Sequence, residues 1–251
     1  MSQERLATMA SERPLEAREA AGSGPPHLAD PRALQILSTE HWSLLTSRSL
    51  VYNEAFARAG MFMTFASASL VALGFLSQAS GFGRDFLVAT AALLGVDLLV
   101  GLATLGRVSA ATTEEFRALQ AMSRIRHAYL EMVPTLEPYI STGWHDDPLS
   151  VLVVYGATPQ RPNLGASFLH GLTTMPGMIS MINAVIGGSL IGVLAMLADL
   201  PSTISLLGGA VGAFAFFGLI WLAARRRFQR INRALEVRFP PEADRVGRGR
   251  G

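Results

Sequence analysis

Four long runs of apolar residues dominate the hydrophobic pattern of this 251-residue chain. Residues 59–80, 175–198 and 200–224 contain no charged side chain, and residues 86–106 contain only one, Asp97. Each run reaches the roughly 20 residues that an α-helix needs to cross about 30 Å of hydrocarbon. The buried helices of soluble proteins are usually shorter and carry a polar stripe. The pattern therefore predicts four transmembrane helices.

The segments between these runs define how they pair. Only a few residues separate the first run from the second and the third from the fourth, with turns predicted at 81–85 and 199–201. We therefore expect an all-α, polytopic membrane protein with four transmembrane helices in two hairpins, 59–106 and 175–224, and with cytoplasmic helical extensions.

The remaining sequence is polar or amphipathic. Residues 1–31 show no apolar period and are predicted to be a disordered tail. In residues 32–58, apolar positions recur every three or four residues, which predicts a cytoplasmic amphipathic helix. Residues 107–174 are predicted to form a cytoplasmic helix and a linker, in which the β-branched stretch 150–155 reads as a short strand or a buried loop. Residues 225–251 form a basic tail.

Charge gives the orientation of the four spans. All 21 basic residues are arginine, which suggests a GC-rich bacterial genome, such as an actinobacterial one. Twenty of them precede the first span, lie between the hairpins or follow the last span, and only Arg84 lies in a hairpin turn. Because arginine-rich segments stay in the cytoplasm, we expect an inner-membrane protein with both termini cytoplasmic. The chain has no cysteine, which excludes disulfides.

Asp97 is the most informative single residue, because it lies near the middle of the second span. A carboxylate at that depth costs roughly 2.5–3.5 kcal/mol, so it should face other helices or water. Matching depths across the first hairpin places Ser69 beside it, and Asn183 of the third span should lie about a turn closer to the cytoplasm. These three residues form a candidate intramembrane polar site. Two interpretations stay open: Asp97 lines an ion or proton pathway, or it is a structural hydrogen-bonding group.

Glycines of the last two spans suggest close helix packing. Gly188 and Gly192, and Gly208 and Gly212, have the GxxxG spacing that lets helix backbones approach each other. They can pack within the second hairpin or between subunits of a homo-oligomer.

Arginines directly after the last span form a second candidate site. Arg225, Arg226, Arg227 and Arg230 are placed to bind anionic lipid headgroups of the bilayer, although such a cluster also serves as an orientation signal. No aromatic platform accompanies them, so nucleic-acid binding is not expected.

Motifs of catalysis are missing from the sequence. It contains no phosphate-binding loop, no G-x-S-x-G elbow and no H-E-x-x-H pair, so we expect no enzyme, no cofactor and no metal site. His145, Asp146 and Asp147 are ligand types for a metal, but loop capping explains them better. His127 and Glu131 share a helix face and are expected to form a solvated pair.

The layout resembles that of the SLATT-domain membrane proteins, which are thought to be pore-forming effectors. Residues 42–60, the first hairpin and residues 107–131 correspond to their entry helix, two-span hairpin and following cytoplasmic helix, whereas the second hairpin is a departure. The resemblance implies an oligomeric, channel-like protein with cytoplasmic assembly or sensing helices. The alternatives are a non-conducting scaffold that presents these helices to a cytoplasmic partner, and a proton-coupled carrier that uses Asp97.

Overall fold

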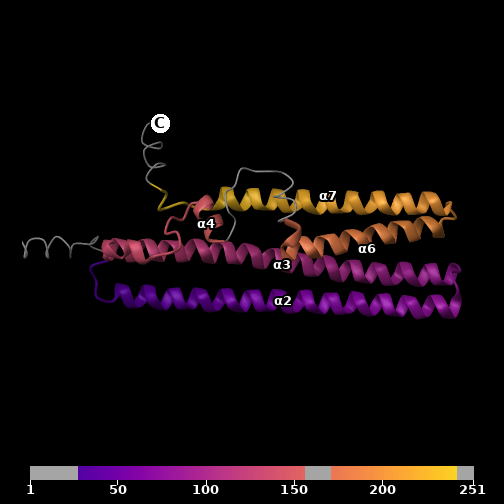
Figure 1. Cartoon of the computed structure of the whole chain (residues 1–251), viewed down its shortest axis with the longest axis horizontal. Coiled ribbons are helices and arrows are strands. Elements are labelled where there is room, and N and C mark those ends of the chain that lie inside the picture. Colours follow the sequence, from indigo (N-terminus) through magenta and orange to yellow (C-terminus); the bar gives the residue numbers. More distant parts are fainter. Residues whose placement is uncertain (1–27, 156–170, 242–251) are drawn as a thin grey trace, which may run out of the picture. The chain divides into compact units, whose positions relative to one another are not determined.

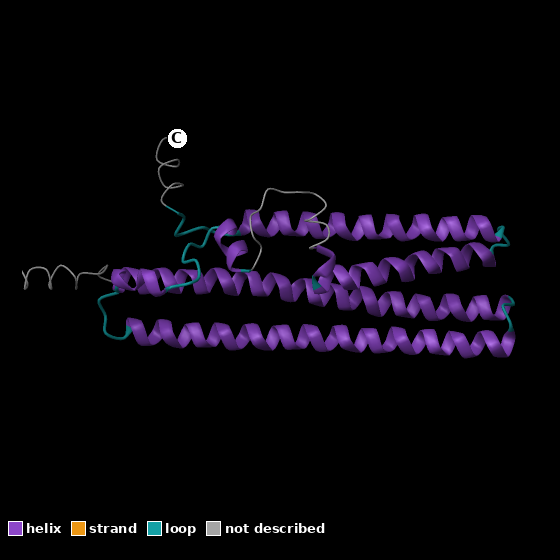
Figure 2. Cartoon of the chain, viewed as in Figure 1, coloured by secondary structure: helices purple, strands orange, loops and turns teal. Residues whose placement is uncertain are grey.

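The computed structural model describes residues 28–155 and 171–241, without the side chain of residue 234. Nearly all of the predicted disordered tail, residues 156–170 of the predicted linker and residues 242–251 of the basic tail lie outside the described residues. The described part contains helices and connecting segments but no strand (Figure 2). Four of its helices are long and apolar enough to cross a membrane, which confirms the predicted fold class.

The first hairpin consists of α2 (Ala33–Ser80) and α3 (Arg84–Met132), which lie side by side (Figure 1). With 48 and 49 residues, each helix rises by about 70 Å, more than twice the hydrocarbon thickness. The turn between them contains Gly81 with φ of 64°, a left-handed conformation that glycine adopts without steric cost. The amphipathic helix predicted at 32–58 is thus the first part of α2, and the helix predicted after the second span is the last part of α3.

The second hairpin consists of α6 (Met175–Leu197) and α7 (Ser202–Ala234). Thr174 caps α6 by accepting a hydrogen bond from the backbone N–H of Gly177, and Pro176 lies in the first turn, where its missing N–H leaves no hydrogen bond unmade. At the other end, Asp199 forms the turn with φ of 59°. Its carboxylate lies 3.7 Å from the guanidinium of Arg84, so an exposed ion pair joins the turns of the two hairpins.

The contacts divide the described chain into two units. We call residues 49–115 and 171–235 the membrane unit, and residues 28–48, 116–155 and 236–241 the extramembrane unit.

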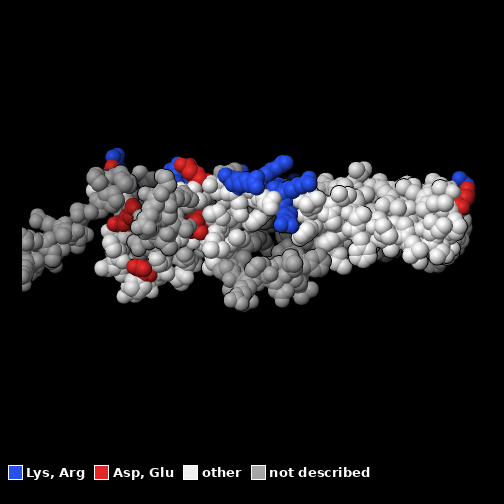
Figure 3. All heavy atoms as spheres, turned by 90° about the horizontal axis from the view of Figure 1, so that it is seen from above, with Lys and Arg blue, Asp and Glu red and all other residues white. Residues whose placement is uncertain are grey.

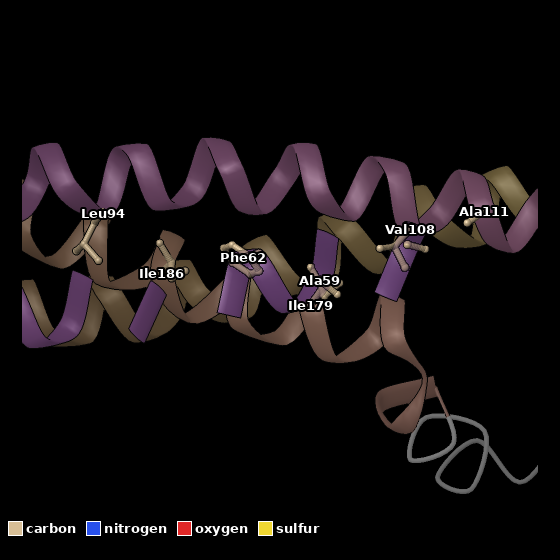
Figure 4. Close-up of a cluster of buried hydrophobic side chains, with 8 residues drawn as sticks. Ala59, Phe62, Leu94, Val108, Ala111, Ile179 and Ile186 are labelled. Atoms are coloured by element: carbon tan, nitrogen blue, oxygen red, sulfur yellow. The ribbon is translucent and has the colours of Figure 1, made fainter. Parts of the chain in front are cut away.

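The core of the membrane unit follows a stripe on each helix of the first hairpin. On α3, the buried positions alternate in steps of four and three residues, the spacing by which packed helices interlock: Thr90, Leu94, Asp97, Gly101, Thr104, Val108 and Ala111. On α2, Ala55, Ala59, Phe62 and Ser69 are buried. Ile179 and Ile186 of α6 pack against this cluster (Figure 4). Large apolar side chains elsewhere stay exposed, as expected for surfaces that face lipid.

Small residues bring α6 and α7 together. A Cβ atom added at Gly188 would lie 2.5 Å from the Gly209 carbonyl oxygen and 2.5 Å from Ala213 Cβ, so only glycine fits there. Gly192 approaches the Ser205 carbonyl. The contact row on α7 is therefore Ser205, Gly209 and Ala213.

The predicted GxxxG pair on α7 is only partly in this contact. Gly208 faces open space, and Gly212 lies against Ile191 rather than against a glycine of α6.

The extramembrane unit is built on the end of α3. After α3 come the 3₁₀ helix η1 (Pro134–Tyr139), the short helix α4 (Pro148–Val154) and, much later in the chain, the segment that follows α7. The prediction of a strand or buried loop at 150–155 is wrong. Asp147 accepts a hydrogen bond from the Ser150 backbone N–H and Pro148 lies in the first turn, so these helix-start signals prevail over the β-branched residues.

Candidate functional site

Asp97 and Ser69 form a buried hydrogen-bonded pair in the membrane unit. Asp97 is 2% exposed, and the Ser69 hydroxyl donates to its Oδ1 at 2.9 Å. Since Ser69 belongs to α2 and Asp97 to α3, the bond joins the two helices of the first hairpin in the middle of their apolar runs. Two of the three residues of the predicted polar site are thus brought together.

Asn183 of α6 is fully buried but makes no hydrogen bond to Asp97. Its Nδ2 donates to the carbonyl of Ile179 in its own helix at 2.9 Å, while its Oδ1 has no hydrogen-bond partner in the described structure. The carboxamide lies directly against Gly101, four residues from Asp97 on the buried stripe of α3. Asn183 therefore places an unpaired acceptor one helical turn from the aspartate, on the side of Arg107.

Gly101 and Phe62 belong to the same site, although no motif of the sequence points to either residue. A Cβ atom at Gly101 would collide with the Asn183 carboxamide and would lie 2.8 Å from Cζ of Phe62, which is 1% exposed. The signal that points to Gly101 is its spacing, because it follows Asp97 by four residues and so lies on the same helix face. The glycine lets α2, α3 and α6 meet beside the aspartate.

The arrangement can bind a proton or a small cation. In the described structure, Ser69 is the only hydrogen-bond donor to the Asp97 carboxylate, and no basic side chain pairs with it. A carboxylate in hydrocarbon that lacks a cationic partner is stabilised by binding a proton or a cation. The Ser69 hydroxyl and the unpaired Oδ1 of Asn183 are further oxygen atoms of the predicted polar site.

An ion network marks one end of the apolar runs in the membrane unit. The Arg107 guanidinium lies 2.7 Å from the Glu54 carboxylate and 3.2 Å from that of Glu114, and Arg58 also bonds Glu54 at 2.9 Å. Hydrogen bonds from Arg107 and then Arg58 lower the pKa of Glu54 to about 2. The network links α2 to α3 at Arg107, the first charged residue after the second span.

The four arginines predicted to meet lipid headgroups lie exposed along α7. The Arg225 guanidinium lies 5.8 Å from the centre of the Trp221 ring, a cation–π contact. None of the four makes an ion pair with a described residue. Figure 3 shows basic atoms gathered beside a long surface that has neither basic nor acidic atoms.

Asp146 is the centre of the extramembrane unit. It is fully buried, and its carboxylate accepts hydrogen bonds from Arg124 Nε at 2.7 Å and from the backbone N–H groups of Arg238 and Phe239 at 3.0 and 2.8 Å. Burial alone would raise the pKa of Asp146, but these hydrogen bonds outweigh it and hold the pKa below its ordinary value. We call this contact the Asp146 clamp. It fastens the segment directly after α7 to α3.

The neighbouring titratable residues differ in part from expectation. Asp147 caps α4, as the loop-capping interpretation proposes, whereas Asp146 binds the distant tail. His127 does lie 3.3 Å from Glu131, but the pair is not freely solvated, because Phe239 packs on the His127 ring with centroids 4.3 Å apart. Among the described residues, no three His, Asp or Glu side chains are grouped as metal ligands.

Comparisons with protein-family models, with curated proteins and with solved structures found no match to this chain. The resemblance to SLATT-domain proteins stays one of layout.

Proposed function

We propose that the protein is an oligomeric, channel-like membrane effector, in which protons or small cations cross the bilayer past Asp97. The observation that carries the proposal is the buried, unneutralised carboxylate of Asp97, which only Ser69 stabilises among the described residues. Ionisable groups inside membrane spans are costly, and they commonly mark ion or proton pathways. Because Asp97 faces the helices of its own chain, the proposed pathway passes through each protomer rather than along an axis between subunits.

The extramembrane unit has the connections that a control element needs. α2 and α3 run without a break from it into the spans, and the Asp146 clamp holds the residues that directly follow α7. A change in the clamp therefore acts on the end of α7, because Ala234 lies four residues before Arg238. In this proposal the unit lies in the cytoplasm of a bacterial cell, with both termini on the same side of the inner membrane.

The test is ion flux into vesicles that contain the purified protein. A pH-sensitive dye inside the vesicles reports proton entry, and the same assay with potassium or sodium gradients reports cations. We expect Asp97→Asn to reduce flux at least ten-fold, because the amide can neither release a proton nor attract a cation.

Thr90→Val is the matched control, since Thr90 lies on the same buried stripe but its hydroxyl bonds only the Phe86 carbonyl of its own helix. Equal flux in wild type and Asp97→Asn would refute the pathway. Flux that requires a second solute would identify a carrier. Cross-linking in bilayers that found only monomers would exclude a homo-oligomer.

A non-conducting scaffold is the second candidate. Three apolar side chains at the beginning of α2 are exposed, although they lie in the extramembrane unit: Leu34 at 59%, Ile36 at 65% and Trp42 at 68%. Exposed apolar groups outside the bilayer favour a protein partner. Wild-type vesicles without flux, together with a partner that is captured by wild type and lost in Trp42→Ala, would favour the scaffold.

A further inference from the structure

A cavity of about 390 Å³ opens in the membrane unit between α3, α6 and α7. Its walls are mainly apolar, with Leu105 from α3, Gly177 from α6, and Phe217, Ile220 and Ala224 from α7. Cavities of this size and character hold small molecules or parts of larger ones. The permeation pathway proposed above does not use it, because neither Asp97 nor Ser69 lines it.

The cavity lies at the depth where the apolar runs end. Leu105 comes two residues before Arg107, and Ala224 directly precedes Arg225, the first charged residue after the last span. Gly177 is in the first turn of α6. The ends of these two apolar runs and the beginning of α6 therefore place the cavity where the hydrocarbon of a bilayer gives way to the glycerol and phosphate groups of its lipids. Trp221, which also lines the cavity, is the residue type that concentrates at this depth.

The charge around the cavity is positive. Arg227 lines it, and Arg225, Arg226 and Arg230 follow the same helix. Within the described parts of the chain these arginines have no ion-pair partner, and the only acidic residue between 171 and 235 is Asp199, in the turn at the other end of α6 and α7. The apolar walls and the unneutralised arginine thus require an occupant that has both an apolar and an anionic part.

We propose that this cavity is a binding site for one anionic phospholipid. An acyl chain lies against the walls formed by Leu105, Phe217 and Ile220, and the headgroup phosphate is bound by Arg227. A free phosphate would leave the apolar walls exposed to water, and a neutral lipid would leave the arginine without a counter-charge. This site is independent of ion permeation, and it differs from general attraction to a negative membrane surface because one position, Arg227, dominates the binding.

Native mass spectrometry of the full-length protein in detergent tests the proposal. The protein is stripped of lipid and offered equal amounts of phosphatidylglycerol and phosphatidylcholine. We expect one retained phosphatidylglycerol per chain. Arg227→Gln should weaken its binding about five-fold, the factor that corresponds to about 1 kcal/mol for one basic residue near an anionic surface. Arg233→Gln, which removes a charge from the same helix outside the cavity, is the matched control and should leave the retained lipid in place.

A second pair of variants tests the apolar wall without changing charge. Ala224→Leu fills the cavity and should weaken lipid retention by about four-fold for each methylene group displaced. Ala215→Leu makes the same change at an exposed position of α7 outside the cavity and should have no effect.

Three results would overturn the proposal. They are equal retention of the two lipids, equal losses in Arg233→Gln and Arg227→Gln, and displacement of the lipid by millimolar inorganic phosphate. The last result would show that the arginines bind phosphate without the acyl chain.

Discussion

Replacing Gly101 with alanine tests how the two hairpins pack around the polar site. The added methyl group would meet Asn183 of α6 and Phe62 of α2 at distances that real Cβ atoms do not show. Neither neighbour can move easily. Phe62 is 1% exposed, and turning the Asn183 carboxamide away breaks its hydrogen bond to the Ile179 carbonyl.

The size of the effect follows from a comparison with a second glycine on the same helix. Gly95→Ala is the control, because nothing lies within 4 Å of its added Cβ. Both variants gain the helix propensity of alanine, about 1 kcal/mol in water, so this gain cancels in the difference. Overpacking of a filled core costs about 1–3 kcal/mol. Gly101→Ala should therefore be less stable than Gly95→Ala by about 1–3 kcal/mol.

Equilibrium unfolding in mixed micelles measures this difference. The double variant Gly101→Ala with Asn183→Ala should recover part of the loss, since the smaller side chain makes room, and the coupling energy should be about 1 kcal/mol or more. Equal stability of Gly101→Ala and Gly95→Ala, or strict additivity in the double variant, would refute the contact between α3 and α6.

Four further variants, one of them a control, test other parts of the structure. Asp146→Asn should release the tail and lower the free energy of opening at residues 238–239 by about 2 kcal/mol, measured by hydrogen exchange. Because the folded pKa of Asp146 lies below its ordinary value of 3.8, the wild-type protection should be complete above that pH and should fall as pH drops through the folded value, whereas the variant should show no such pH step. Gly188→Ala should destabilise the second hairpin by about 1–3 kcal/mol in the same unfolding assay, and Gly208→Ala should not. Glu54→Gln should lower the melting temperature at low salt and have little effect at high salt, because the network it belongs to is exposed.

Charge and length were enough to predict the spans and the pairing of Ser69 with Asp97. The spans follow from the lengths of the uncharged runs. The pairing follows from counting residues along two antiparallel helices of equal rise, which needs no knowledge of the other elements. The depth of Asn183 also follows from counting. Its hydrogen bond does not, because an asparagine in a helix can bond its own backbone four residues back instead of a neighbouring helix.

Helix rotation explains what the glycine pattern could not predict. Gly208 and Gly209 are neighbours in the sequence but belong to different rows of small residues on α7, one with Gly212 and the other with Ala213. The two rows are related by a helix rotation of about 100°, and the rotation of α7 decides which of them faces α6. The contact falls on Gly209 because Ser205 and Ala213 continue its row. The Asp146 clamp joins residues 92 and 93 positions apart, and its bonds to the tail come from backbone N–H groups, which leave no sequence signature.

The most direct test of the proposed pathway is a current recording from the purified protein in a planar bilayer with a pH difference across it. If protons cross past Asp97, the reversal potential of the wild-type current should follow the pH gradient, and Asp97→Asn should abolish that current while Thr90→Val keeps it. A wild-type protein that carries no current, or an Asp97→Asn current with the same size and reversal potential as that of the wild type, would refute a proton pathway past Asp97.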